Sequence, residues 1–253
     1  MPFVTSADGT EIGYDRAGAG PALVLVDGAM CYRAAGPMRP LAALLQEHFT
    51  VYSYDRRGRG ESGDTQPYAV RREVEDLQAV ISAAGGSAAV YTMSSGGALA
   101  LSAAAQGSGI TALALYEPPF VGADPRYTAE LTDLLAQGRR GDAVALFMSR
   151  VGMPAEAIAG FRASPGFATL EAIAPTLAYD DAVLDPGKVR PEVAAAVRVP
   201  TVVIAGGASP AMLRDAARET AAALPSATLE VLDGQTHDVD PAALAPLLVK
   251  LLG

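Results

Sequence analysis

A serine on a sharp turn could act as a nucleophile in this chain. Ser94 stands in the segment VYTMSSGG, residues 90–97, between an apolar run typical of a strand and an alanine-rich run typical of a helix. A serine at such a turn has strained backbone geometry, so the residues two positions away must be small, and Gly96 meets this need on one side. The turn lifts the Ser94 hydroxyl above the sheet edge. It also places the Ser95 amide at a helix N-terminus, where it can donate to a developing oxyanion.

A histidine near the end of the chain is the candidate base for this hydroxyl. A serine needs an adjacent base at neutral pH, and histidine titrates in the right range. The chain has two histidines, His48 and His237. His48 lies at the end of a predicted helix, before the strand TVYSY and at the face opposite the carboxyl ends of the strands. His237 lies in a loop at the carboxyl end of the last predicted strand, where open α/β sheets bind ligands. We therefore expect His237 to be the general base.

The elements that must position these two residues form a repeating pattern. Short β-rich runs alternate with longer helical patterns, which is typical of parallel strands joined by helical crossovers. An N-terminal hairpin is predicted over residues 3–15. The further predicted strands are 22–26, 50–54, 88–93, 110–116, 201–205 and 228–232, and the predicted helices that join them are 40–48, 70–84, 98–105, 210–224 and 241–252.

One long segment interrupts this alternation. Residues 119–198 contain helical patterns and no convincing strand, so we expect a helical cap insertion on a core made of residues 1–118 and 199–253. The helical patterns within the insertion cover residues 128–137, 141–151, 154–162 and 191–197.

Composition limits the kind of protein and partner. A chain of 253 residues with 50% hydrophobic residues is typical of one α/β domain. Its net charge of −9 argues against nucleic acid and favours a small-molecule substrate. We see neither a signal sequence nor an apolar run long enough to span a membrane, so we expect a cytoplasmic location. One cysteine and two histidines favour no disulfide and no metal site. Nothing indicates the oligomeric state.

Three segments together resemble the α/β-hydrolase superfamily. They are the serine turn, the segment YDRRGRGES at 54–62, which is similar to the family's D-x-R-G-x-G-x-S turn, and the histidine loop GQTHD at 234–238. Thr92 stands where the family's G-x-S-x-G pattern has its first glycine. The resemblance covers essentially the whole chain and implies a mostly parallel central sheet with helices on both faces and a helical cap. We expect the arginine-rich turn to shape the chain and assign it no catalytic role.

The resemblance also implies an acid that orients the histidine. In most members it follows the strand that corresponds to residues 201–205, but Ser209 occupies that place here and cannot stabilise an imidazolium. Some members, including relatives of haloalkane dehalogenases, take the acid from the end of the preceding strand, where this chain has Glu117. Glu117 would preserve the family's order of nucleophile, acid and base. Asp215 on the next helix, or no acid at all, stays an alternative.

The resemblance places the second oxyanion donor in the loop after residues 22–26. The family usually has His-Gly there, and Asp27 replaces the histidine. Because the donor is a backbone amide, that of Ala29, the replacement need not abolish the oxyanion hole. We expect Cys31 to be a buried or pocket-lining residue and not a nucleophile, because nothing in the sequence pairs it with a base. The residues expected to line the substrate pocket are Asp27, Met30, Cys31 and Met93.

These residues predict a cofactor-independent serine hydrolase that cleaves an apolar carboxylic ester, lactone or thioester. Two alternatives stay open: a non-hydrolytic enzyme of the same fold, such as a lyase, cyclase or perhydrolase, and a catalytically weak protein that binds small ligands. The departures at Asp27, Thr92 and Ser209 keep the first alternative open, whereas the retained serine and histidine argue against the second. The insertion would set substrate preference, and its pocket-wall candidates, most of them expected to be packing residues, are Phe120, Tyr127, Leu146, Phe147, Met148, Met153 and Phe161.

Overall fold

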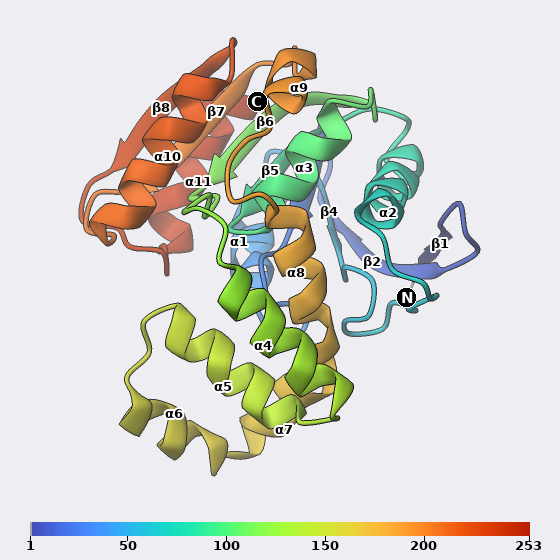
Figure 1. Ribbon diagram of the computed structural model, residues 1–253. Helices are drawn as coiled ribbons and strands as arrows, with labels where there is room; N and C mark the ends of the chain where they lie inside the picture. Colours follow the sequence, from blue (N-terminus) through green and yellow to red (C-terminus); the bar gives the residue numbers. More distant parts are fainter. Residues whose placement is uncertain (1) are drawn as a thin grey trace.

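A single eight-stranded sheet crosses the centre of the computed structural model, which describes residues 2–253 (Figure 1). The strand order is β1-β2-β4-β3-β5-β6-β7-β8. β1 pairs antiparallel with β2, and β2 pairs antiparallel with β4. All the pairs among β3 to β8 are parallel. The strands are β1 (Phe3–Thr5), β2 (Glu11–Ala17), β3 (Ala22–Val26), β4 (Thr50–Tyr54), β5 (Ala88–Met93), β6 (Ile110–Tyr116), β7 (Thr201–Gly206) and β8 (Ala227–Leu232). All the strands predicted from the sequence are present, and the predicted fold class is confirmed.

Helices cover both faces of the sheet because its central strands are apolar on both faces. In β3 the side chains of Leu23 and Leu25 pack into one buried cluster, and those of Val24 and Val26 pack into another. Full burial of each such side chain contributes about 1.5–3 kcal/mol. The first face is covered by α1 (Met38–Leu45) and α11 (Pro241–Leu252), and the second by α2 (Val70–Ala83), α3 (Gly96–Ala104) and α10 (Ala211–Ala223).

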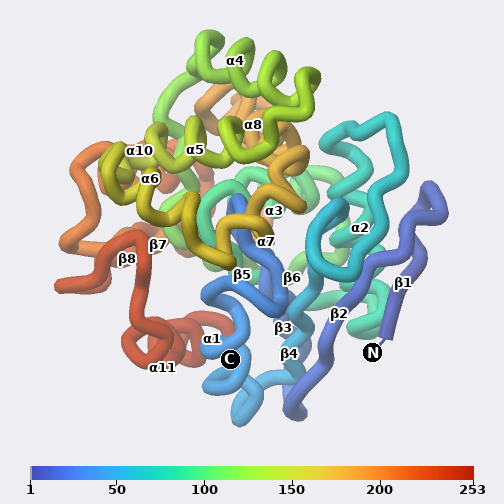
Figure 2. The backbone as a smooth tube through the Cα atoms, turned by 90° about the horizontal axis from the view of Figure 1, so that it is seen from below, coloured from blue at the N-terminus to red at the C-terminus, as the bar shows by residue number. Residues whose placement is uncertain are grey.

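The chain between β6 and β7 is helical. In Figure 1 most of this segment lies below the sheet, and Figure 2, seen from below, shows it in front of the strands. Its helices are α4 (Pro125–Ala136), α5 (Arg140–Arg150), α6 (Ala155–Arg162), α7 (Pro165–Ile173), the 3-10 turn η1 (Ala174–Thr176), α8 (Leu177–Leu184) and α9 (Pro191–Ala196). None of the described helices is long and apolar enough to cross a membrane.

Two helices of this segment, α7 and α8, were not predicted from the sequence. Pro165 and Gly166 begin α7, and Pro175 lies in η1 just before α8, so residues that usually end helices obscure the helical period. Proline is tolerated in the first turn of a helix, where its missing amide would have no partner. The structure places Pro165 at that position.

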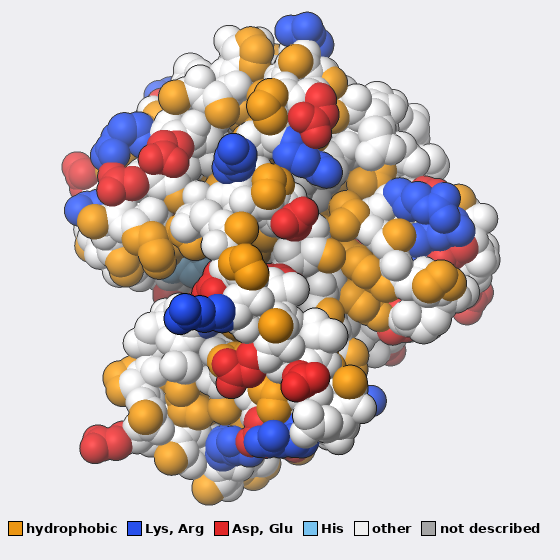
Figure 3. All heavy atoms as spheres, viewed as in Figure 1, with side chains coloured by type: hydrophobic (Ala, Val, Ile, Leu, Met, Phe, Trp, Pro, Cys, Tyr) orange, Lys and Arg blue, Asp and Glu red, His pale blue; other side chains and the backbone are white. Residues whose placement is uncertain are grey.

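The inserted helices have a buried cluster of their own, which we call the cap cluster. It includes Leu131, Val144, Phe167 and Leu177. Met30, from the loop after β3, belongs to the same cluster and is 8% exposed. The inserted helices therefore pack on the loop that the sequence assigns to the candidate site. Figure 3 shows a hollow between the two lobes, in which a histidine and acidic side chains are visible.

Candidate active site

Ser94 directly follows β5, and α3 begins two residues later. Its φ angle is 56°, in the left-handed region that costs an L-residue about 1–2 kcal/mol. The Ser94 amide donates to the Tyr116 carbonyl at 2.9 Å, which ties the turn to the end of β6. A Cβ on Gly96 would lie only 2.8 Å from the Val26 carbonyl oxygen. Glycine at this position is therefore what lets the turn approach the neighbouring strand.

Backbone strain is concentrated at this edge of the sheet. Among residues 2–253, three residues other than glycine have a positive φ: Met30 at 60°, Ser94 at 56° and Glu117 at 44°. They lie just beyond the ends of β3, β5 and β6, which are neighbours in the sheet. Strained residues persist where the surrounding structure holds them, and they cluster at functional sites. The clustering supports a site at the carboxyl ends of these strands.

Glu117 and His237 are in direct contact. The Nδ1 atom of His237 lies 2.8 Å from Oε2 of Glu117. The Glu117 side chain is fully buried, and its Oε1 accepts the Gly206 amide at 2.8 Å, whereas the His237 side chain is 37% exposed. Since Glu117 follows Tyr116, whose carbonyl binds the Ser94 amide, the structure brings all three predicted catalytic residues to one edge of the sheet.

The surroundings of Glu117 keep it charged. Burial disfavours the carboxylate, but the contacts with His237 and the Gly206 amide favour it, and the pKa of Glu117 lies below its usual range. Ser209 occupies the place where the family usually has its acid. Here its buried hydroxyl has no hydrogen-bond partner within residues 2–253, and the carboxylate comes from the end of the neighbouring strand.

The alternative acid has a different partner. The Asp215 side chain is 58% exposed and pairs with Arg218 on the same helix. The Nδ1 contact of His237 goes to Glu117, so the geometry favours Glu117 over Asp215.

The loop after β3 lies against the candidate nucleophile. A Cβ on Gly28 would be 2.9 Å from the Ser94 Cβ and 3.5 Å from its Oγ. Within residues 2–253, neither the Ala29 amide nor the Ser95 amide has a hydrogen-bond partner. These two unpaired amide donors lie on the segments where the sequence predicts the oxyanion donors.

Comparison with known proteins identifies the family. The model of the alpha/beta hydrolase family matches residues 18–247, which is most of the chain. The chain belongs to the alpha/beta hydrolase family. An alpha/beta hydrolase from Sphaerobacter thermophilus is 49% identical, with 100% of both chains covered and a TM-score of 0.91.

Two structures share the fold at lower identity. A hydrolase from Pseudomonas aeruginosa is 22% identical, covers 100% of this chain and 98% of its own, and has a TM-score of 0.77. The enol-lactonase from Burkholderia xenovorans is 24% identical, covers 99% of each chain and has a TM-score of 0.73.

In this family member the predicted pocket residues differ in exposure. Asp27 is 2% exposed, its Oδ1 has no partner among the described residues, and burial raises its pKa to about 7. Burial likewise raises the pKa of the partly exposed Cys31 thiol to about 12. A thiol with so high a pKa is a poor nucleophile at neutral pH. Met93 is half-buried, and Met30 is covered by the inserted helices.

The residues of the insertion that were pocket-wall candidates mostly pack. Tyr127 and Met148 belong to the cap cluster, and Leu146, Phe147 and Phe161 pack against it. Phe120 belongs to the core cluster on the face of the sheet that α2, α3 and α10 cover, and Met153 is 37% exposed.

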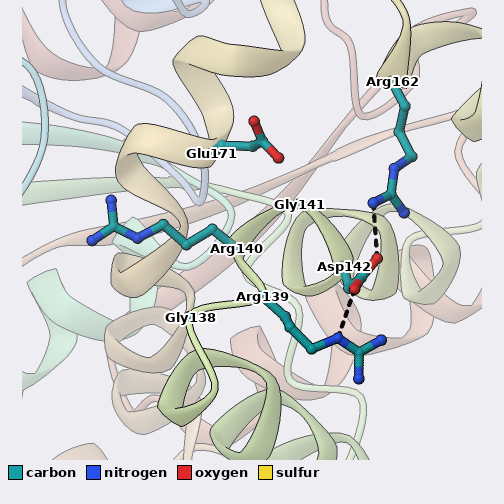
Figure 4. Close-up of a pocket in the computed structure, with 7 residues that line it drawn as sticks. All are labelled: Gly138, Arg139, Arg140, Gly141, Asp142, Arg162 and Glu171. Carbon is teal, nitrogen blue, oxygen red and sulfur yellow. Dashed lines mark hydrogen bonds and ion pairs between the residues drawn. The ribbon is translucent and has the colours of Figure 1, made fainter.

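A second hollow lies on the surface of the insertion, where Asp142 bridges Arg139 and Arg162 (Figure 4). It contains none of the residues assigned to the candidate site. Among the described residues we find no group of three or more histidine, cysteine or acidic residues that could hold a metal ion.

Sequence reasoning missed a buried ionic cluster beside the site. Arg56, Arg59 and Asp180 are buried, and both arginines pair with Asp180 across the boundary between the core and the insertion. The available signal was the run of arginines at 56–59, which cannot be buried without carboxylate partners. Which carboxylates those are depends on the tertiary structure, because Asp180 is far away in the sequence.

Proposed function

We propose that this chain is a serine hydrolase that cleaves a carboxylic ester, a lactone or a thioester through an acyl-enzyme. The observation that carries the proposal is the 2.8 Å contact between His237 Nδ1 and the buried Glu117 carboxylate, at the sheet edge that also holds the strained Ser94. A carboxylate at Nδ1 holds the ring proton there, which leaves Nε2 free to accept the proton of Ser94.

In the proposed reaction, Ser94 Oγ attacks the substrate carbonyl carbon while His237 takes the hydroxyl proton. The amides of Ala29 and Ser95 donate to the oxyanion of the tetrahedral intermediate, and each such donor contributes about 3–4 kcal/mol in comparable enzymes. His237 then gives the proton to the leaving group. A water molecule, activated by the same base, attacks the acyl-enzyme and releases the acid. Glu117 stabilises the imidazolium in both halves of the reaction.

We further propose that residues 119–198 act as a cap over this site and that the acyl group of the substrate is apolar. The support is the packing of Met30 in the cap cluster, which places the inserted helices on the loop that contacts Ser94. A cap in this position excludes water and limits which acyl groups fit.

Labelling with a fluorophosphonate probe, together with turnover of p-nitrophenyl esters, lactones and thioesters, tests the proposal. Ser94→Ala is the control and should abolish both labelling and turnover without changing the melting temperature. Labelling of Ser94 with no turnover of any substrate class would favour a non-hydrolytic enzyme. A folded protein that binds small apolar ligands and is never labelled would favour a binding protein.

A further inference from the structure

Asp180 connects the inserted helices to the residue that follows the candidate nucleophile. It lies on α8, and its side chain is 5% exposed. Its Oδ1 accepts hydrogen bonds from the Ser95 hydroxyl at 2.7 Å and from Arg56 Nη1 at 2.8 Å, and its Oδ2 accepts one from Arg59 Nη2 at 2.7 Å. Burial opposes ionisation of Asp180, but the charges of Arg59 and Arg56 outweigh it and hold its pKa below the usual range. The carboxylate therefore stays charged at neutral pH.

The same two arginines hold the loop after β3. Arg59 Nη1 donates to the carbonyl oxygens of Gly28 and, at 3.3 Å, Cys31. Arg56 Nη1 lies 3.4 Å from the Asp27 carbonyl oxygen. One carboxylate is thus linked to both segments that carry the free amides of the candidate oxyanion hole.

The contact with Gly28 fixes the direction of the Ala29 amide. The Gly28 carbonyl and the Ala29 N–H belong to one planar peptide unit, and in a trans peptide they point in opposite directions. When Arg59 holds the carbonyl oxygen, the N–H must point away from Arg59. A charged donor on the carbonyl also polarises the peptide group and makes its N–H a stronger donor.

We propose that Asp180 is a positioning residue, which aligns the Ala29 and Ser95 amides through Arg59, Arg56 and the Ser95 hydroxyl. This inference rests on the proposed function. The cluster acts by orientation and not by net charge, because the two guanidinium groups are balanced by Asp180 and by Glu73, which binds Arg56 through both oxygens. It also makes the alignment of the oxyanion donors depend on where α8 sits.

The same turn supplies a matched control. Arg57 is also fully buried, and it pairs with Asp76, whose side chain is 1% exposed. The other hydrogen bonds that the Arg57 side chain donates within residues 2–253 go to Asp8, Thr65 and Arg72, none of which belongs to the loop after β3 or to the turn at Ser94. Asp76→Asn therefore breaks a buried ion pair of the same turn without touching the candidate site.

Steady-state kinetics of Asp180→Asn and Asp76→Asn on a p-nitrophenyl ester test the inference. Loss of an oxyanion donor lowers kcat by about 10²–10³, so misaligned donors should lower kcat of Asp180→Asn about 10- to 100-fold with KM within about twofold. Asp76→Asn should keep kcat within about twofold of the wild-type value, even if its melting temperature falls as much as that of Asp180→Asn. Equal kcat losses in the two variants, or a loss in Asp180→Asn confined to KM, would overturn the inference.

A second variant and a second measurement remove the dependence on folding and on turnover. Ser95→Ala deletes only the hydroxyl bound to Asp180. It should lower kcat by roughly three- to tenfold, which is less than the loss caused by removing a whole donor. An unchanged kcat would contradict the positioning role. Hydrogen exchange of residues 27–31 should be faster in Asp180→Asn than in Asp76→Asn. If the wild-type protein hydrolyses none of the esters, lactones and thioesters, the proposed function fails, and equal exchange in both variants would then refute the positioning role separately.

Discussion

Replacing Glu117 by glutamine keeps the size of the side chain and removes its charge, which isolates what the carboxylate does for His237. The glutamine carbonyl oxygen can still accept the Gly206 amide, as Oε1 of Glu117 does at 2.8 Å. Its NH₂ group would then face His237 Nδ1. That nitrogen would have to become an acceptor, which moves the ring proton to Nε2 and leaves no lone pair for the hydroxyl of Ser94.

The size of the effect follows from the geometry. In the transition state the imidazolium carries a positive charge 2.8 Å from a buried carboxylate oxygen. Unit charges about 4 Å apart attract by about 4 kcal/mol at an effective dielectric constant of 20, which corresponds to about a thousandfold in rate. His237 is 37% exposed, so water screens part of this attraction. We expect kcat of Glu117→Gln to fall by about 10² to 10³.

The assay is kcat and KM on the best p-nitrophenyl ester, with Asp215→Asn as the matched control. Asp215 carries the same charge on the helix after β7, but its side chain is 58% exposed and pairs with Arg218. Its replacement should leave kcat within about twofold, as is usual for exposed ion pairs. Near-normal turnover in Glu117→Gln together with a large loss in Asp215→Asn would refute the assignment of the acid.

Three further predictions concern the loop after β3. Because burial raises the pKa of Asp27 to about 7, the unfolded chain releases this proton above about pH 4 and the folded protein keeps it, so stability falls as pH rises between those values. Asp27→Asn should therefore gain up to about 4 kcal/mol over wild type between pH 4 and 8 in urea unfolding, and a constant difference would contradict this cause. Gly28→Ala puts a Cβ 2.9 Å from the Ser94 Cβ and should cost about 1–3 kcal/mol of stability, with at least a tenfold loss of kcat; normal kinetics would disprove the close approach. Native Cys31 should resist iodoacetamide at pH 8, since burial raises its pKa to about 12, whereas rapid modification of the folded protein would show an accessible thiolate.

The fold could be predicted because its strands are decided locally. An apolar run such as ALVLV at 22–26, with Gly-Pro before it and Asp-Gly after it, is typical of a strand buried on both faces. Helices α7 and α8 could not be predicted in the same way. Proline and glycine hide their period, and packing within the cap cluster, with Phe167 and Leu177 buried, stabilises them.

The candidate site was predictable to different degrees. Residue type and position on the sheet singled out Ser94 and His237. A nucleophilic serine needs a sharp turn after a strand, and its base must lie at the same edge of the sheet. The sequence favoured Glu117 as the acid but left Asp215 open, since both follow suitable strands. Their side-chain contacts distinguish them, and the catalytic role of Glu117 stays a prediction until its variant is measured.

The sequence by itself determined which residue types stand at the ends of which strands, since strands, turns and the order of elements follow from short-range pattern. Only the tertiary structure decided which carboxylates contact the residues at those strand ends. Asp180 and Asp181 are neighbours on one helix, yet Asp180 is buried against Arg56 and Arg59, while Asp181 binds the exposed Thr128 hydroxyl. Successive residues of a helix point about 100° apart, so the rotation of α8 against the core selects one of them. That rotation is set by packing between segments 121 residues apart, and no local pattern contains it.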